Sequence, residues 1–195
     1  KEFIPVAEAM GLIHQVDFWV VDHALDLLRS MPENIAFAIN LSGNVFLDEK
    51  LYPLVQNKLK QTGIDPERVV FEITETSAIS NFEMTKRMVT SLRSLGCRFA
   101  LDDFGAGFNS YSYLKHFPVD ILKIDGGFIT DLDNDPVDQL LVKSMIDIAH
   151  SLGKKTVAEF VERESTLELL RGYGVDFVQG YLVGKPQSGI NTAKK

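Results

Sequence analysis

Six polar residues recur at regular intervals in this 195-residue chain, each near the end of a short apolar run. They are Asn40, Glu72, Asp102, Lys123, Glu159 and Gln179. Their mean spacing is about 28 residues, which is the length of one strand-plus-helix unit. We therefore expect each unit to carry one polar group to the carboxyl ends of parallel strands, where α/β folds place their active sites.

Carboxylates dominate this set, because Asp103 adds a fourth acid to Glu72, Asp102 and Glu159. An ionised carboxylate buried without a partner costs several kcal/mol, so either protons or cations must neutralise such a cluster. With the amide oxygen of Asn40, the predicted ligands are all oxygens, which select hard cations such as Mg²⁺, Mn²⁺ or Ca²⁺. The alternative is that each acid is a helix N-cap or a salt-bridge partner.

Adjacent acids at a strand end suggest a more specific chemistry. The chain turns where a strand ends, so Asp102 and Asp103 could both reach metal ions. A carboxylate that bridges two ions about 3.5–4 Å apart is typical of enzymes that displace phosphoesters. Lys123 would then hold the nucleophilic water or neutralise a phosphate oxygen.

A glycine-containing segment, residues 104–110, follows these two acids directly. It lacks the Gly-Lys-Ser/Thr sequence of a P-loop. We interpret it as a mobile lid over the metals, with Glu75 at the neighbouring strand end as its anchor. The alternative is an inert loop in which the glycines only shape a turn.

Strands and helices that could position these residues alternate along the chain. Runs rich in Val, Ile and Phe predict six strands, and stretches of helical period predict helices between and before them. The strands are 35–42, 69–76, 98–105, 119–126, 155–161 and 177–183, and the helices are 18–31, 44–60, 82–95, 137–152 and one from 166. This alternation predicts an α/β fold with a parallel sheet.

Two architectures are compatible with six strands. A TIM-like (β/α)₈ barrel needs eight units and typically about 250 residues, so this chain would hold about six of its eight strands. Residues 1–195 would then be a single domain, incomplete on its N-terminal side. The alternative is an open, doubly wound sheet that is complete with six strands.

Composition excludes several classes of protein. The 27 acidic and 20 basic residues give a net charge of −7, which argues against a broad surface for DNA or RNA. One cysteine excludes a disulfide scaffold, and no apolar run is long enough for a membrane span. We expect a cytoplasmic domain, although segments outside this sequence could anchor the parent protein to a membrane.

Taken together, the chain resembles the EAL-domain family, the cyclic di-GMP phosphodiesterases of bacterial signalling. Motifs in family order extend over nearly the whole chain, and the run is specific although each piece alone is weak. They are Phe3-Ile4-Pro5-Val6-Ala7-Glu8, Asn40-Leu41-Ser42, Phe71-Glu72-Ile73-Thr74-Glu75, Leu101-Asp102-Asp103-Phe104-Gly105, Leu122-Lys123-Ile124-Asp125, Ala158-Glu159-Phe160-Val161-Glu162 and Gln179-Gly180-Tyr181-Leu182.

The resemblance implies a (β/α)₈ barrel that hydrolyses cyclic di-GMP to linear pGpG with two Mg²⁺ or Mn²⁺ ions. It implies metal binding by the acids and Asn40 named above, an attacking water held by Lys123, and catalytic support from the neighbouring polar groups. By position, the metal ligands are Asn40, Glu72, Asp102, Asp103 and Glu159; the catalytic residues are Lys123, Glu159, Glu162 and Gln179; the substrate contacts are Asp103 and Pro186; and the loop anchor is Glu75.

The same resemblance implies a homodimer, because in the family the loop that begins at Phe104 links the metal site to the dimer interface. It also makes a fused diguanylate cyclase or sensor domain an expected neighbour in the parent protein.

Three departures from the family pattern stand out. The Glu-Ala-Leu signature, expected before Phe3, is absent, in agreement with the strand count. Phe160 stands where glycine is common, and the loop reads Gly-Phe-Asn-Ser rather than Gly-Tyr-Ser-Ser. A catalytically inactive cyclic di-GMP receptor or protein-interaction module is therefore the main alternative. A metal-dependent proton abstractor with Lys123 as base is a third.

Overall fold

The structure is a computed structural model that describes residues 3–107 and 111–187. The chain divides into two compact units, residues 1–122 and 123–195, and each is described by itself. The part of the glycine-containing loop at 108–110 and the last eight residues lie outside the described residues.

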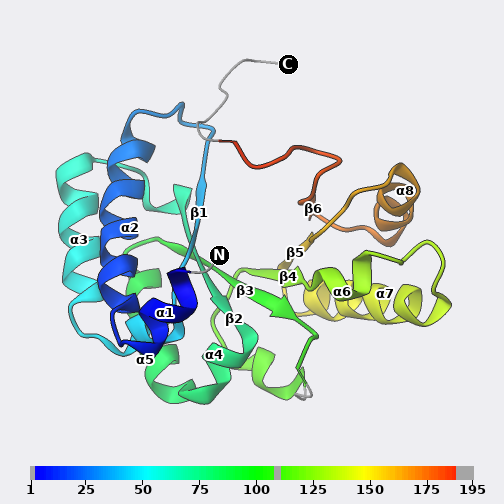
Figure 1. Cartoon of the computed structure of the whole chain (residues 1–195), viewed down its shortest axis with the longest axis horizontal. Helices are drawn as coiled ribbons and strands as arrows, with labels where there is room; N and C mark the ends of the chain where they lie inside the picture. The colour runs from blue at the N-terminus through cyan, green and yellow to red at the C-terminus, as the bar shows by residue number, and fades with distance from the viewer. Residues whose placement is uncertain (1–2, 108–110, 188–195) are drawn as a thin grey trace. The chain divides into compact units, whose positions relative to one another are not determined.

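The first unit is built from three parallel strands with helices between them (Figure 1). Short 3-10 turns at Gly43–Leu47, Pro66–Arg68 and Tyr111–Lys115 complete it. In chain order its elements are α1 (Phe3–Ala9), α2 (Ile13–Arg29), β1 (Phe37–Asn40), α3 (Leu51–Thr62), β2 (Val69–Thr74), α4 (Glu75–Ser80), α5 (Phe82–Ser94) and β3 (Arg98–Phe104).

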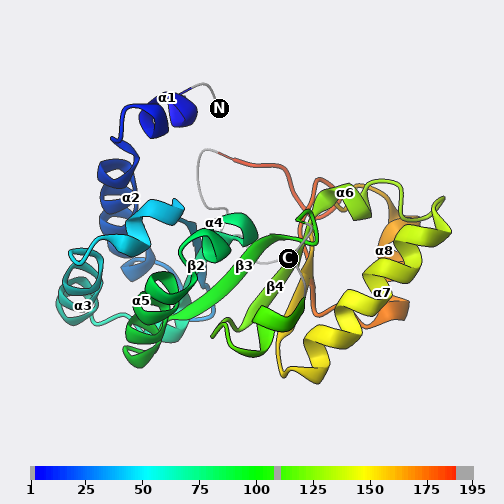
Figure 2. The same ribbon diagram turned by 90° about the horizontal axis from the view of Figure 1, so that it is seen from below.

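The second unit begins inside strand β4 (Ile121–Ile124) and repeats the strand–helix alternation. Strands β5 and β6 pair in parallel, and α6 packs against α7 (Figure 1); Figure 2 shows the same elements from below. The remaining elements are α6 (Gly126–Ile129), α7 (Pro136–Ser151), β5 (Lys155–Ala158), α8 (Glu164–Tyr173) and β6 (Phe177–Val178).

The predicted α/β class is confirmed, and the strand order decides between the two architectures. Strands follow chain order, β1-β2-β3 in the first unit and β4-β5-β6 in the second. A doubly wound sheet reverses direction at a switch point, whereas a barrel adds each strand beside the previous one. The order within each unit is therefore that of a barrel.

Several element boundaries differ from the sequence prediction. The stretch predicted as one helix over 44–60 is a 3-10 turn followed by α3, because the Asp48 carboxylate accepts the N–H of Lys50 at 2.9 Å and the backbone of Asp48 is extended. Helix α2 begins at Ile13 rather than at 18. Strand β6 holds two residues of the predicted seven.

Apolar faces of the helices and strands form the core of the first unit. Val21, Leu25 and Leu28 of α2 are fully buried, and the rings of Phe71 and Phe99 lie 5.6 Å apart on adjacent strands. Burying each such side chain contributes about 1.5–3 kcal/mol. These contacts place β1, β2 and β3 in the register that the site requires.

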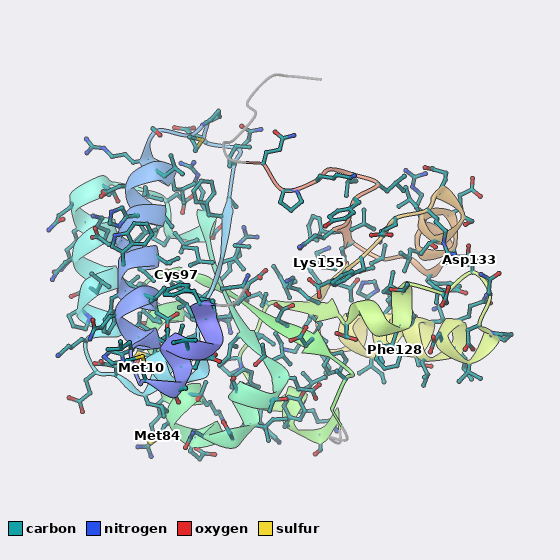
Figure 3. All side chains as sticks on the ribbon, in the orientation of Figure 1. Met10, Met84, Cys97, Phe128, Asp133 and Lys155 are labelled. Atoms are coloured by element: carbon teal, nitrogen blue, oxygen red, sulfur yellow. The ribbon has the colours of Figure 1, made fainter. Side chains whose placement is uncertain are left out.

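Charged side chains satisfy backbone groups at the amino ends of these strands. The Arg68 guanidinium donates to the carbonyls of Leu28, Met31, Pro32 and Ile35, so it closes the end of α2 and the start of β1. Cys97 directly precedes β3, as Arg68 precedes β2 (Figure 3). Burial raises the pKa of its thiol to about 12, so this cysteine is a small buried hydrophobe.

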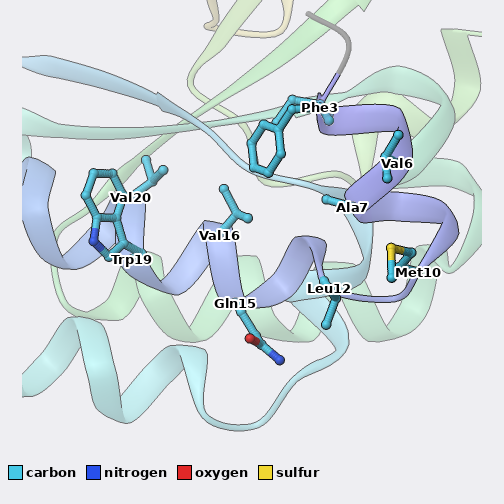
Figure 4. A pocket seen from close by; sticks show the side chains of 10 residues that line it. Phe3, Val6, Ala7, Met10, Leu12, Gln15, Val16, Trp19 and Val20 are labelled. Atoms are coloured by element: carbon cyan, nitrogen blue, oxygen red, sulfur yellow. The ribbon is translucent and has the colours of Figure 1, made fainter.

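An apolar groove of about 790 Å³ opens beside α1 and α2 (Figure 4). Phe3, Val6, Met10 and Trp19 line it, and each of these side chains is more than half exposed.

Among the described residues, every helix is too short or too polar to traverse a lipid bilayer.

Candidate active site

Three predicted ligands of the first unit share one face of its sheet. Asn40 on β1 is level with Glu72 on β2, and Glu72 is level with Ala100 on β3. Asp102 lies two residues beyond Ala100 and so points to the same side. Asn40, Glu72 and Asp102 are therefore carried to one face at the carboxyl ends of three adjacent parallel strands.

Burial alternates along β1, as it does along a strand with one covered face. Ile39 and Leu41 are buried, whereas Ala38 and Asn40 on the other face are exposed. On β2, Glu72 is only 5% exposed although it is an acid. Glu72 is therefore a buried acid on the strand face that also carries an amide and a second carboxylate at neighbouring positions.

Asp103 reaches the same edge through an unusual backbone conformation. Its φ is +53°, in the left-handed region that aspartate tolerates better than most residues. The N–H of Asp103 donates to the Asp102 carboxylate at 3.2 Å, and the two carboxylates offer oxygens within 4.8 Å of one another. This turn brings adjacent residues, which would point to opposite sides of a strand, close enough to share a cation.

Glu75 is buried at the start of α4 and binds the chain on both sides of residues 108–110. One of its oxygens accepts the N–H of Gly105 at 3.0 Å, and the other accepts the hydroxyl of Tyr113 at 2.6 Å. Sequence reasoning identified Glu75 but missed Tyr113. A tyrosine that follows a glycine-containing loop is the only signal the sequence offered.

In the second unit, Lys123 and Glu159 form a buried ion pair. The Lys123 Nζ lies 2.9 Å from a Glu159 oxygen, and the two side chains are 5% and 9% exposed. Lys123 sits near the end of β4, and the N–H of Glu159, just after β5, donates to the carbonyl of Ile124 at 3.4 Å. The strand ends therefore place these two predicted catalytic residues side by side.

The backbone of Gln179 forms hydrogen bonds on both sides of Glu159 and Phe160. Its N–H donates to Ala158 at 2.8 Å, and its carbonyl accepts the N–H of Val161 at 3.0 Å. The side chains of Gln179, Glu162 and Pro186 are all exposed. The structure thus places Gln179 beside the Glu159 segment, whereas Pro186 lies in an irregular stretch after β6.

Two backbone features of this segment escaped sequence reasoning. Phe160 has a φ of +53°, which is the left-handed conformation that glycine adopts freely and which explains why glycine is common there. At Gly180, a Cβ would lie 2.2 Å from the backbone oxygen of Val161, so no side chain fits.

Comparison with known proteins decides the family. The model of the EAL domain matches residues 1–186. The chain belongs to the EAL domain family.

Three similar proteins carry cyclic di-GMP phosphodiesterase in their names. The chain is 38% identical over 194 residues to cyclic di-GMP phosphodiesterase PdeF of Escherichia coli, covering 97% of this chain and 26% of that protein. It is 40% identical over 189 residues to cyclic di-GMP phosphodiesterase PdeB of Shewanella oneidensis, covering 95% and 22%. It is 35% identical to the bifunctional diguanylate cyclase/cyclic di-GMP phosphodiesterase MucR of Pseudomonas aeruginosa, covering 95% and 28%. The chain thus spans about a quarter of these proteins.

Solved structures share the fold. The FimX EAL domain of Pseudomonas aeruginosa bound to c-di-GMP is similar with a TM-score of 0.92 and 32% identity over 98% of this chain and 78% of that one. The MucR phosphodiesterase in its c-di-GMP complex is similar with a TM-score of 0.88 and 35% identity, over 95% of this chain and 76% of that one. Klebsiella pneumoniae BlrP1, in a calcium and c-di-GMP complex, is similar with a TM-score of 0.81 and 29% identity, over 87% of this chain and 43% of that one. These similarities confirm the expected TIM-barrel-like α/β fold, of which the chain holds six strands.

Proposed function

We propose that this chain belongs to a cyclic di-GMP phosphodiesterase that hydrolyses one phosphodiester to give linear pGpG. The observation that carries the proposal is the shared face of Asn40, Glu72 and Asp102 at the carboxyl ends of three adjacent strands. It occurs in an EAL domain, whose relatives PdeF and PdeB bear the name of this activity. We also propose that residues 1–195 form part of one such domain.

The oxygens of the first unit fit hard divalent cations. Asn40, Glu72, Asp102 and Asp103 would hold them, and the resemblance to the family implies the same role for Glu159. No thiolate or imidazole belongs to this set, so we propose Mg²⁺ or Mn²⁺, two ions in number. The calcium in the BlrP1 complex supports a divalent-cation site in this fold. Bound cations would stabilise negative charge on the phosphate oxygens and acidify a water molecule.

Lys123 would position the attacking water. Its ammonium is buried in an ion pair with Glu159, which fixes its position. Glu162 and Gln179 would orient the same water, and Asp103 and Pro186 would contact the substrate. The anchor of Glu75 on Gly105 and Tyr113 would hold the start of the loop that follows the metal-binding acids.

We propose a homodimer as the working form, as expected for an EAL domain. The name of MucR supports a fused diguanylate cyclase as one arrangement of the parent protein, and a sensor domain is another. A cytoplasmic location remains part of this proposal.

The decisive experiment measures cyclic di-GMP binding and pGpG formation in parallel, with Mg²⁺, with Mn²⁺ and with a chelator. We expect hydrolysis that the chelator abolishes. Glu72→Ala and Asp102→Ala should each reduce turnover at least about 100-fold, because each removes a direct cation ligand. Asp120→Asn, at the opposite end of the strands of the first unit, is the matched control and should retain turnover.

The outcomes separate the proposal from its alternative. Binding of cyclic di-GMP without any product would indicate a receptor, which is the second candidate function. Substantial Mg²⁺-dependent turnover in Glu72→Ala or Asp102→Ala would contradict the metal assignment.

A further inference from the structure

Asp17 on α2 is a buried carboxylate that binds the chain just beyond Asn40. It is 5% exposed, and both of its oxygens accept hydrogen bonds from Ser42. The backbone N–H of Ser42 donates to one at 3.1 Å, and the Ser42 hydroxyl donates to the other at 2.5 Å. Burial raises the pKa of the Asp17 carboxyl, and the bonds from Ser42 oppose that rise.

Ser42 gives up its usual role to make these bonds. It is the N-cap residue of the 3-10 turn Gly43–Leu47, with φ of −66° and ψ of 148°. An N-cap serine normally accepts a backbone N–H from the following turn with its hydroxyl oxygen. Here no such side-chain bond forms, and the hydroxyl is oriented towards Asp17 instead. Asp17 therefore fixes both the backbone and the side chain of Ser42.

The other side of this segment is fixed by β2. The N–H of Leu41 donates to the carbonyl of Glu72 at 3.1 Å, which extends the β1–β2 pairing one residue beyond Asn40. Leu41 is also buried, so its side chain resists rotation of the segment. Residues 41 and 42 are thus held from both sides, by β2 and by α2.

Asn40 itself depends on this support, because its side chain is exposed. Packing cannot set the direction of an exposed carboxamide, so the backbone that follows Asn40 must set it. Asn40 stands level with Glu72 on the neighbouring strand, and a rotation of its peptide would change the direction in which its side chain leaves β1.

We propose that Asp17 is a positioning residue for the cation site: through Ser42 it directs the carboxamide of Asn40 towards the edge that Glu72 shares. The inference rests on the proposed function, because it assigns Asn40 to a cation. Outer groups that orient a ligand typically change metal affinity by about 10–100-fold.

The test measures Mn²⁺ affinity by calorimetry, the side-chain amide signal of Asn40 by NMR, and the melting temperature. Asp17→Asn should weaken Mn²⁺ binding about 10-fold or more and shift the Asn40 amide signal. Ser42→Ala, which keeps the backbone N–H, should have a smaller effect in the same direction, and Ser42→Thr should restore affinity. The double variant Asp17→Asn/Ser42→Ala should bind no more weakly than Asp17→Asn, because both act through one contact.

Asp120→Asn is the matched control. Asp120 also accepts a backbone N–H, from Phe99 at 2.9 Å, and a side-chain bond, from Arg93 at 2.6 Å, but at the amino ends of the strands. It should lower the melting temperature and leave Mn²⁺ affinity unchanged.

Each outcome bears on a distinct claim. Wild-type affinity in Asp17→Asn, with weakened binding in Asn40→Ala, would overturn the positioning role and leave the proposed function standing. Equal affinity in wild type, Asn40→Ala and Asp17→Asn would overturn the assignment of Asn40 and, with it, this inference. A loss of melting temperature in Asp17→Asn and Ser42→Ala with no change in affinity would also overturn it.

Discussion

Two lysine–carboxylate pairs lie at opposite ends of the strands in the second unit. At the amino ends, Lys155 (Figure 3) reaches Asp176 at 2.6 Å with a side chain that is 64% exposed. At the carboxyl ends, Lys123 reaches Glu159 at 2.9 Å with both side chains almost fully buried. The same chemical pair therefore occurs once in contact with water and once without it.

The two acids also differ in their surroundings, since Asp176 accepts further hydrogen bonds whereas Glu159 precedes a strained residue. Asp176 also accepts the N–H and hydroxyl of Thr156 and a bond from His150, so it ties the start of β6 to the start of β5. Glu159 is followed by Phe160 in a left-handed conformation, which costs about 1–3 kcal/mol. The amino ends contribute stability, whereas the carboxyl ends retain costly features, as expected where a barrel carries its chemistry.

The largest effect should come from replacing the buried lysine. Lys123→Met removes the cation beside a buried carboxylate, so we expect the free energy of unfolding to fall by about 3–5 kcal/mol. Turnover should fall at least about 100-fold, as for loss of a general catalytic group. Chemical denaturation and product analysis measure the two effects.

Lys155→Met is the control for that variant. An exposed pair is worth about 0–1 kcal/mol, so the expected loss is small and turnover should not change. Equal losses of stability for Lys123→Met and Lys155→Met would break the contrast between the two ends.

A smaller effect is expected at Asp176, and it should depend on pH. The bonds from Lys155, His150 and Thr156 outweigh its burial and hold the pKa of Asp176 well below the usual 3.8. The stability this group contributes is present above the unfolded pKa and is lost as pH falls further, because the unfolded chain then binds the proton first. Asp176→Asn should cost about 1.5–3 kcal/mol at neutral pH.

Unfolding curves at pH 7 and at pH values below 4 measure this difference. The gap between wild type and Asp176→Asn should narrow as pH falls. A gap that stays constant across this range would contradict the role of the ionised Asp176 in closing the amino ends.

The smallest effect concerns the space that the ring of the strained residue Phe160 occupies beside Gly126. A Cβ at Gly126 would lie 2.2 Å from the Phe160 ring, so Gly126→Ala should destabilise the protein by about 1–3 kcal/mol. Phe160→Gly removes the ring, and Gly126→Ala should cost less than half as much in that background. Urea denaturation of the four proteins of this cycle measures the coupling.

Gly172 in α8 provides the matched control. No atom lies within 4 Å of the Cβ that would be added there, and Gly172→Ala should be neutral or stabilising by about 0.5–1 kcal/mol. An equal cost of Gly126→Ala with and without Phe160 would show that the ring does not occupy that space.

Much of the first unit could be predicted from its sequence. The predicted strand at 35–42 contains β1, and Asn40 ends β1 with its side chain on the face opposite the buried Ile39 and Leu41. The departure at Phe160 was visible as an unexpected residue, but its left-handed backbone was not, because one side chain does not reveal φ. Tyr113 could not be assigned to Glu75, since the two residues are 38 positions apart and no local pattern links them.

The sequence by itself determined the α/β alternation, the six strands and the polar residue near the end of each, because period and residue type act locally. It also carried the motifs of the EAL domain. Only the tertiary structure decided that Asp17 binds Ser42, that Lys123 binds Glu159 and that strand order follows chain order within each unit. Such contacts join residues distant in sequence, and packing together with the cost of burying charge selects them.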